Sequence, residues 1–402
     1  MIKKKLGNGK TMKRLLRISL DTLISSLMSI LIWFVLSLII NKNLINIFTL
    51  TFPIQYVSSI LISIFATGAN ISKEKGNKED TMSGIFFGIL FTIILSIIFL
   101  FNIDIYLNFM KYTVDKLFVI YSVIQILLHT ILRFILTKLY YEGKNILANK
   151  YSIGFYLLNF VCILITSIFI SNSVYIVIIT LLILAIYTIY ILIKNSEKFK
   201  LKFNIFNWIK YDAVTLSDNI ILCLAYLFGL SGTVSYGEEY ILALTFIALI
   251  TDTQWDISDS ISTAAKIDIS QNNFNYKTHI KNAKILSLIL IISVLCMFGV
   301  LYKFYNLNLL ITLIFLIFHI VDFAICPYYK INTYYLQLEY SLKKTTFTNL
   351  SARFLRLLLS FLKTPYCTVI AQVSSSIYQA ICMKLLFQKN YSVDLNGQVI
   401  KK

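Results

Sequence analysis

Long apolar runs separated by short polar segments cover the whole chain. Each run is close to the roughly 20 residues that an α-helix needs to cross the hydrocarbon core of a bilayer. The tenth run is the longest and contains Pro327, so we expect that helix to be kinked or broken there. The pattern predicts an all-α polytopic membrane protein with twelve transmembrane helices, at 15–40, 46–70, 83–102, 115–139, 151–171, 173–194, 212–231, 238–263, 284–303, 307–336, 346–362 and 366–387.

Composition supports a membrane protein and excludes an ordinary soluble domain. Of the 402 residues, 58% are hydrophobic and only 14% are charged. Soluble domains are nearer half apolar and a quarter charged. The excess apolar surface therefore has to be covered by lipid, and the lipid bilayer is the first partner that the sequence predicts.

The basic residues are distributed unevenly between the two sides of the predicted spans. Of the 37 Lys and Arg residues, 29 fall in the two terminal segments and the even-numbered loops, and only five fall in the odd-numbered loops. Lys and Arg collect on the cytoplasmic side of membrane proteins. We therefore expect a multi-pass protein of the cell membrane with both termini in the cytoplasm. This orientation explains the net charge of +18 without any nucleic-acid partner.

The predicted spans divide into two halves. The longest basic link, from Lys194 to Lys210, lies close to the middle of the chain. Glu142 after the fourth span and Glu339 after the tenth are about half a chain apart. Six spans per half make the halves parallel repeats. We expect two six-helix bundles, 1–200 and 201–402, around a central cavity.

Three carboxylates lie on one face of the predicted eighth span. At about 100° per residue, Asp252, Asp256 and Asp259 fall within an arc of about 60°. Charged side chains at such depth cost several kcal/mol in lipid and usually face a cavity or a partner. We expect them to form an ion-coupling or substrate site, with Asp252 near the membrane midplane. Alternatively, Asp256 and Asp259 are solvated near the cytoplasmic mouth and pair with Lys266.

Two further aspartates belong to the candidate ion-coupling set. Asp218 lies on the seventh span and could face Asp252. Asp322 precedes Pro327, where an unwound stretch could offer backbone carbonyls to an ion. His319 and Asp322 are three residues apart, so they could hydrogen-bond as a structural pair or as a proton relay.

Three arginines lie within predicted spans: Arg133, Arg353 and Arg356. Arg353 and Arg356 need counter-charges, which Asp322 or the aspartates of the eighth span could supply. Alternatively, the three arginines line a cationic cavity for an anionic substrate.

No motif of a catalytic or nucleotide-binding site is present. The sequence contains no Walker A motif, no GxSxG and no HExxH, and no segment is long enough for an extramembrane domain. We expect a protein that is not an enzyme, with no cofactor and no metal apart from a coupling H⁺ or Na⁺.

Several short motifs resemble those of a transporter family. The loop after the second span lacks the Asp-Arg pair of the major facilitator motif. The segments Thr67–Asn70 and Gly76–Lys78, the exit Tyr141–Asn145, and the stretches Asp252–Asp256 and Pro365–Cys367 resemble the multidrug and toxic compound extrusion (MATE) family and its wider flippase superfamily. One departure is that the first span offers only Asp21, near its cytoplasmic end, for the acidic residue of that family's N-terminal half.

The resemblance implies a secondary active transporter. A passive membrane scaffold is disfavoured, since a scaffold has little reason to hold buried carboxylates. The transporter would couple H⁺ or Na⁺ to export of a small organic cation by alternating access, as a monomer. The alternative is a flippase for a lipid-linked oligosaccharide or polysaccharide precursor.

Overall fold

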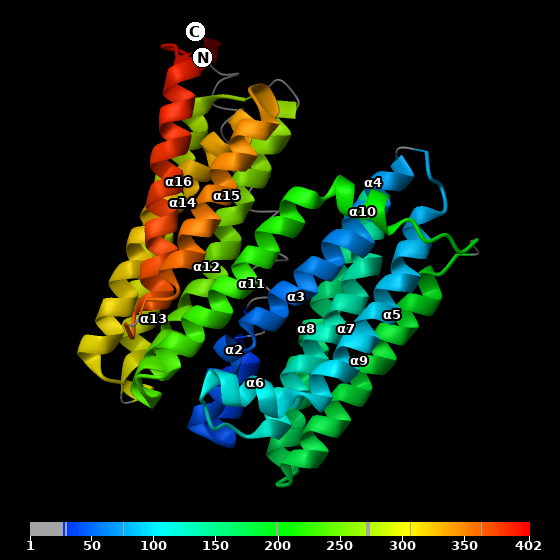
Figure 1. The fold of residues 1–402 in the computed structure, drawn as a ribbon. Coiled ribbons are helices and arrows are strands. Elements are labelled where there is room, and N and C mark those ends of the chain that lie inside the picture. The colour runs from blue at the N-terminus through cyan, green and yellow to red at the C-terminus, as the bar shows by residue number, and fades with distance from the viewer. Residues whose placement is uncertain are drawn as a thin grey trace. The chain divides into compact units, whose positions relative to one another are not determined.

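The computed structural model describes residues 27–402 apart from 29, 75, 198–199, 271–273, 306 and 363. Some further helical side chains are not described, among them those of residues 252–264. The described chain is almost wholly helical and packs as two compact units (Figure 1). We call residues 27–235 the N-terminal unit and residues 236–402 the C-terminal unit. The division into bundles at residue 200 stays a prediction.

The N-terminal unit begins with a helix at Ile30–Ile39. Its further elements are η1 (Lys42–Ile45), α2 (Asn46–Leu50), α3 (Phe52–Ile62), η2 (Ser63–Gly68), α4 (Ala69–Glu74), α5 (Asp80–Phe101), α6 (Ile103–Met110), α7 (Lys116–Tyr141), α8 (Asn145–Phe169), α9 (Ser173–Asn195), α10 (Ile205–Tyr211) and α11 (Ala213–Val234).

The C-terminal unit contains five long helices and one small hairpin. These are α12 (Glu238–Ser270), α13 (Tyr276–Tyr305), α14 (Leu309–Glu339), α15 (Leu342–Leu359), α16 (Cys367–Asn390), β1 (Tyr391–Val393) and β2 (Val399–Lys401). The two strands pair antiparallel, with Tyr391 opposite Lys401.

Each predicted span has a helical counterpart in the described chain. Nine helices among the described residues are long and apolar enough to cross a membrane. The first predicted span continues beyond residue 26 as the shorter apolar helix Ile30–Ile39, and the eighth and eleventh form α12 and α15, which carry more charges. On α5, large apolar side chains such as Phe86, Ile97 and Phe101 are exposed, as expected for a surface in contact with lipid.

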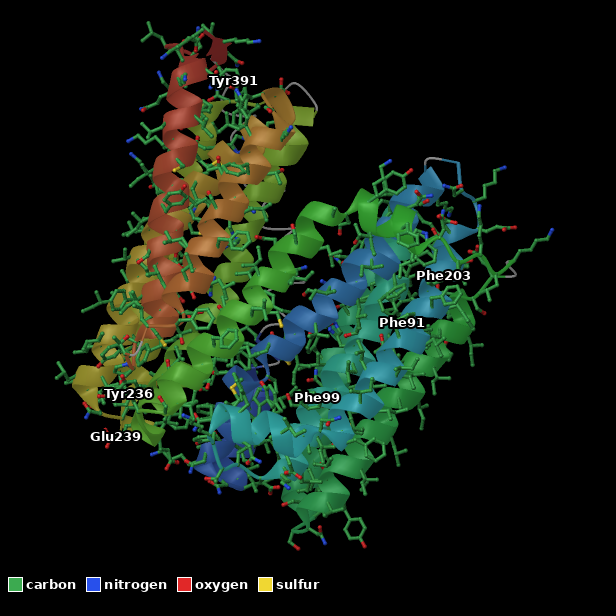
Figure 2. The ribbon with its side chains drawn as sticks, in the orientation of Figure 1. Phe91, Phe99, Phe203, Tyr236, Glu239 and Tyr391 are labelled. Carbon is green, nitrogen blue, oxygen red and sulfur yellow. The ribbon has the colours of Figure 1, made fainter. Side chains whose placement is uncertain are left out.

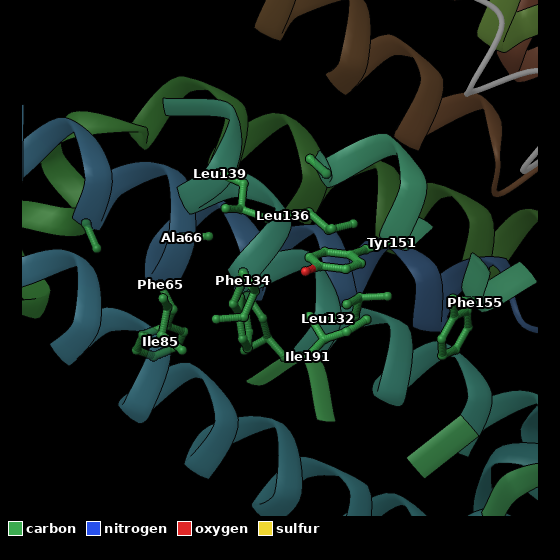
Figure 3. Packing of buried hydrophobic residues seen from close by; sticks show 14 of the residues in the cluster. Phe65, Ala66, Ile85, Leu132, Phe134, Leu136, Leu139, Tyr151, Phe155 and Ile191 are labelled. Atoms are coloured by element: carbon green, nitrogen blue, oxygen red, sulfur yellow. The ribbon is translucent and has the colours of Figure 1, made fainter. Parts of the chain in front are cut away.

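The core of the N-terminal unit is aromatic and lies between α5, α7, α8, α9 and η2 (Figure 3). Phe65 of η2 packs face to face with Phe91 of α5, with ring centroids 5.1 Å apart. Phe134 of α7 is fully buried in the same cluster. Shape-matched packing of this kind holds helices together in lipid, where the hydrophobic effect does not act between them.

The segments predicted to be cytoplasmic lie together at one end of each unit. In the N-terminal unit, the Lys138 Nζ atom at the end of α7 is 2.6 Å from the Glu197 Oε1 atom after α9. In the C-terminal unit, the Tyr391 hydroxyl donates to the carbonyl of Glu339 at the end of α14, at 2.8 Å. Figure 2 shows Tyr391 at the opposite end of this unit from Tyr236 and Glu239. This agrees with the predicted alternation, whereas the side of the membrane stays a prediction.

The basic link after α9 contains a helix that the sequence analysis did not anticipate. In α10 the Trp208 side chain is fully buried, and its Nε1 atom donates to the Asp80 Oδ2 atom at 3.0 Å. Ser72 and Asn204 donate to the same oxygen, at 2.6 and 3.0 Å. Gly68 permits the close approach, because any Cβ there would collide with the Trp208 backbone. Asp80 therefore joins the loop before α5 to α10.

Of the kink or break expected at Pro327, the break is wrong, and the kink stays a prediction. Helix α14 continues through Pro327 without interruption, although proline cannot donate the helical hydrogen bond. Neighbouring helices stabilise such prolines within membrane helices. The structure therefore contains no unwound stretch at Pro327 that could offer backbone carbonyls to an ion.

Removal of the Trp208 side chain should destabilise the N-terminal unit. Truncation of a buried tryptophan costs about 3–5 kcal/mol in cores, so we expect Trp208→Ala to lower the apparent melting temperature of the purified protein markedly. The matched control is Phe206→Ala on the same helix, because Phe206 is 86% exposed. Equal effects of the two substitutions would show that α10 is not anchored through Trp208.

A pH dependence should arise from the ion-pair cluster after α7. Burial alone would raise the pKa of Glu142, but the hydrogen bond from Lys144 and the charges of Lys138, Lys144 and Lys73 hold that pKa below its usual value of 4.5. A carboxyl with a lowered folded-state pKa stabilises the protein above pH 4.5, and this contribution is lost as the pH falls through the folded-state pKa.

We therefore expect the stability difference between the parent and Glu142→Gln to be largest at neutral pH and to shrink below about pH 4.5. Thermal unfolding of both proteins from neutral pH to well below the usual range of carboxyl pKa values measures this difference. A difference that stays constant with pH would contradict this account.

Candidate functional site

Helix α16 carries a polar stripe through an otherwise apolar segment. The residues that form it recur at helical spacing and are all buried: Thr368, Gln372, Ser375, Ser376 and Gln379. The stripe faces protein rather than lipid, because α16 packs against both α14 and α15. In a bilayer, buried polar side chains at this spacing indicate a built polar interior.

An aspartate and an arginine meet across this stripe through one glutamine. The Gln372 Nε2 atom donates to the Asp322 Oδ2 atom of α14 at 2.7 Å. The Arg356 Nη2 atom of α15 donates to the Gln372 Oε1 atom at 3.2 Å. All three side chains are buried, and Asp322 is fully inaccessible. We call Asp322 and Arg356, which are connected by Gln372, the bridged pair.

Several polar atoms around the bridged pair have no partner within the described residues. They are the Asp322 Oδ1 atom, both ring nitrogens of His319 and the hydroxyl of Ser375. The predicted hydrogen bond between His319 and Asp322 is therefore wrong, because neither ring nitrogen of His319 has a partner within the described residues. Buried polar atoms without partners are costly and indicate sites where a proton, an ion or water binds.

Charge balance holds the bridged pair together. Arg356 and Arg353 are the cations that act on Asp322, and Arg356 also acts on His319. An isolated buried charge is expensive, whereas a compensated pair is tolerated. Asp322 thus supplies one counter-charge for the arginines and is connected to Arg356 through Gln372. The aspartates of the eighth span, the other predicted source, lie outside the described side chains.

These groups can also be judged as ligands for a coupling ion. A hard cation such as Na⁺ prefers oxygen ligands. Asp322 Oδ1 is an oxygen without a partner among the described residues, and the Ser376 hydroxyl of α16 acts on the same carboxylate. A proton needs only the Asp322 Oδ1 atom.

The remaining predicted site residues lie on α7, α11 and α12. Helix α12 runs through Asp252, Asp256 and Asp259, but their side chains lie outside the described residues. Asp218, on α11, and Arg133, on α7, are half-buried in the N-terminal unit. Their functional roles stay predictions.

His129 lies one turn before Arg133. Its ring packs against Phe155 and Tyr156, with ring centroids 5.3 and 4.9 Å away. This environment is that of a histidine packed among aromatic rings.

Sequence reasoning missed Gln372, which connects Asp322 to Arg356, and Ser376, which acts on Asp322 from the next turn of α16. Their signal was present, because the polar positions of α16 repeat every three or four residues inside an apolar run. Neutral polar residues were passed over because only ionisable residues were counted as costly in lipid. The hydrogen bonds of Gln372 to Asp322 and Arg356 depend on how α14, α15 and α16 pack together. No pattern in the sequence around Gln372 predicts them.

The fold and the site define a polytopic all-α membrane protein with a buried, charge-compensated network in its C-terminal unit. No protein-family model matches the chain. No curated protein matches it either. Solved structures do match over nearly the whole chain.

The MATE multidrug transporter DinF-BH, solved as a complex, is 14% identical, with a TM-score of 0.68 over 94% of this chain and 95% of that chain. An inward-facing multidrug resistance MATE family transporter of the MOP superfamily is 15% identical, with a TM-score of 0.65 over 93% and 96%. A MOP superfamily transporter from Pyrococcus furiosus, whose binding pocket is described as reversed in polarity, is 12% identical, with a TM-score of 0.60 over 94% and 96%.

The chain therefore has the fold of the MATE transporters, an all-α fold of twelve membrane helices. The fold class predicted from the spans and the resemblance to this family are confirmed at the level of the fold. The protein is a multi-pass membrane protein.

The bridged pair should show thermodynamic coupling. Asp322→Asn removes the negative charge that Gln372 connects to Arg356, and breaking a buried pair costs about 3–5 kcal/mol. Asp322→Asn combined with Arg356→Gln removes both charges, so we expect the double variant to be more stable than Asp322→Asn alone. Thermal unfolding of the four proteins in detergent gives the coupling energy. Additive effects would mean that the two charges do not compensate each other.

Proposed function

We propose that this protein is a secondary active transporter that couples H⁺ or Na⁺ to the export of a small organic cation by alternating access. It would act as a monomer in the cell membrane, with both termini in the cytoplasm. The observation that carries the proposal is the bridged pair, a buried carboxylate with one unpartnered oxygen and a compensating arginine, in a chain with the MATE fold.

Asp322 is the coupling group in this proposal. The incoming proton or Na⁺ binds at the unpartnered Oδ1 atom, while Oδ2 keeps its hydrogen bond from Gln372. Neutralising the carboxylate removes a negative charge that compensates Arg356 in a buried setting, which raises the free energy of that packing. Binding of the ion therefore favours a second conformation in which α14, α15 and α16 are arranged differently. Release of the ion restores the bridged pair.

The carboxylates of α12 supply the substrate contacts in this proposal. Asp252, Asp256 and Asp259 follow one face of a membrane helix, and Asp218 lies on the preceding helix. Negative charge at such a position attracts an organic cation. That cation then competes with H⁺ for the same carboxylates. Exchange of one cation for another then needs no further cofactor.

One observation favours a second candidate, a flippase for a lipid-linked oligosaccharide. Two arginines, Arg353 and Arg356, lie on α15 beside the site, and Arg133 lies on α7. Arginine pairs well with phosphate. The Pyrococcus furiosus structure with this fold is described as having a pocket of reversed polarity and a different function.

Transport by reconstituted protein tests the coupling assignment. Proteoliposomes preloaded with a fluorescent cationic dye receive an imposed pH or Na⁺ gradient, and dye efflux is followed. We expect Asp322→Asn, although it is less stable than the parent, to abolish the gradient-driven component at a temperature at which the variant is still folded. Asp104→Asn is the control, because the Asp104 side chain is 63% exposed and pairs with Lys116.

Parent-like gradient-driven efflux by Asp322→Asn would refute Asp322 as the coupling group. Loss of efflux only in Asp252→Asn would move the coupling to α12.

Absence of dye efflux in the parent, with the glycan profile of the cell envelope altered in a deletion strain, would favour the flippase.

A further inference from the structure

The C-terminal unit contains a cavity away from the bridged pair, at the end closed by the β-hairpin. It measures about 590 Å³ and lies between α13, α14, α16 and β1. Tyr276 and Phe387 form one wall with stacked rings, 4.8 Å between centroids. The hairpin turn is held over the start of α13, because the Gly397 carbonyl accepts from the Tyr276 backbone N–H at 2.9 Å.

The lining of this cavity is cationic. Lys284 of α13, Lys384 of α16 and Lys402 after β2 all line it, and no Asp or Glu residue among the described lining does. Within the described chain, neither Lys284 nor Lys384 belongs to an ion pair. Three lysines from three segments around one cavity repel one another unless an anion lies between them.

A buried amide provides a hydrogen-bond donor in the same cavity. Asn332 of α14 is 6% exposed and lines the cavity. Its Oδ1 atom accepts from the Tyr276 hydroxyl at 3.0 Å. Its Nδ2 atom donates to no acceptor within the described residues. This donor is therefore open to a ligand in the cavity.

The depth of the lysines indicates where the anion comes from. Lys384 lies six residues before the end of α16, about 9 Å along the helix, and Lys284 lies eight residues after the start of α13, about 12 Å along it. This depth places the lysine side chains within reach of the interface, where lipid phosphates lie.

We propose that this cavity binds a phosphate-bearing anion, held by Lys284, Lys384 and Lys402 with a hydrogen bond from Asn332. Either the headgroup of an anionic phospholipid or a soluble phosphate compound offers this chemistry. The site is separate from the bridged pair, so its occupancy would regulate or stabilise the C-terminal unit whatever substrate the transporter carries.

Ligand-dependent thermal stability of the full chain in detergent tests the proposal. The probes are dioleoyl phosphatidylglycerol, the zwitterionic phosphatidylcholine with the same acyl chains, and inorganic phosphate or pyrophosphate. A ligand that binds the folded state raises the melting temperature as its concentration rises. We expect the anionic lipid or a soluble phosphate to raise it, and phosphatidylcholine not to.

The variant pair Lys284→Gln with Lys384→Gln should weaken this binding about tenfold or more, since each lysine near an anionic headgroup contributes about 1 kcal/mol. The matched pair is Lys281→Gln with Lys389→Gln on the same two helices. It removes the same charge at exposed positions that do not line the cavity, and we expect it to bind like the parent.

A response to the lipid alone identifies a headgroup site, and a response to inorganic phosphate or pyrophosphate identifies a soluble ligand; both support the proposal. Equal weakening by the two variant pairs would mean diffuse attraction to a basic surface and would overturn the proposal, as would no response to any anion.

If the double variant does not fold, Lys384→Gln alone, at an exposed position, takes its place, with a smaller expected loss of binding.

Discussion

Lipid cannot hydrogen-bond or solvate a charge, and this constraint explains the most informative contacts of the protein. Every buried charge must find its partner within the chain. In the C-terminal unit, Asp322 and Arg356 compensate each other through Gln372. This compensation holds only while Asp322 is ionised, because a bound proton or cation neutralises the carboxylate. The packing of α14, α15 and α16 is therefore stabilised when Asp322 is ionised and less so when it is neutral. A transporter that couples ion binding to a conformational change requires such a difference.

The same constraint applies where the helices end. Asp80 is buried beneath the amphipathic α10 and accepts three hydrogen bonds on one oxygen, from Ser72, Asn204 and Trp208. Lys138 is buried at the end of a membrane helix and is held by Glu197 and by the carbonyl of Asn195. These clusters tie the connecting segments of the N-terminal unit to one another. They also show that some buried charges in this chain serve the structure itself.

The spans were predictable because length and apolar composition determine a membrane helix almost by themselves. The uneven distribution of lysines likewise predicted which segments meet, and the contacts between the ends of α7 and α9 agree with it. Helix α10 and the hairpin after α16 were not predictable, because each depends on a surface made by other helices. Pro327 was misjudged for a related reason, since neighbouring helices keep α14 continuous.

The candidate site was only partly predictable. Asp322 and Arg356 were recognisable as costly residues within spans, but their connection required Gln372, which carries no charge. The aspartates of α12 remain a predicted ion-coupling or substrate site.

The central claim is that Asp322 binds the coupling ion at an oxygen with no protein partner among the described residues, and with H⁺ as that ion the carboxylate becomes protonated. Infrared difference spectroscopy between alkaline and acidic pH measures this directly. We predict a carboxylic acid band at the high frequency of a weakly hydrogen-bonded group, present in the parent and in Asp104→Asn and absent in Asp322→Asn. A band that persists in Asp322→Asn would contradict the account.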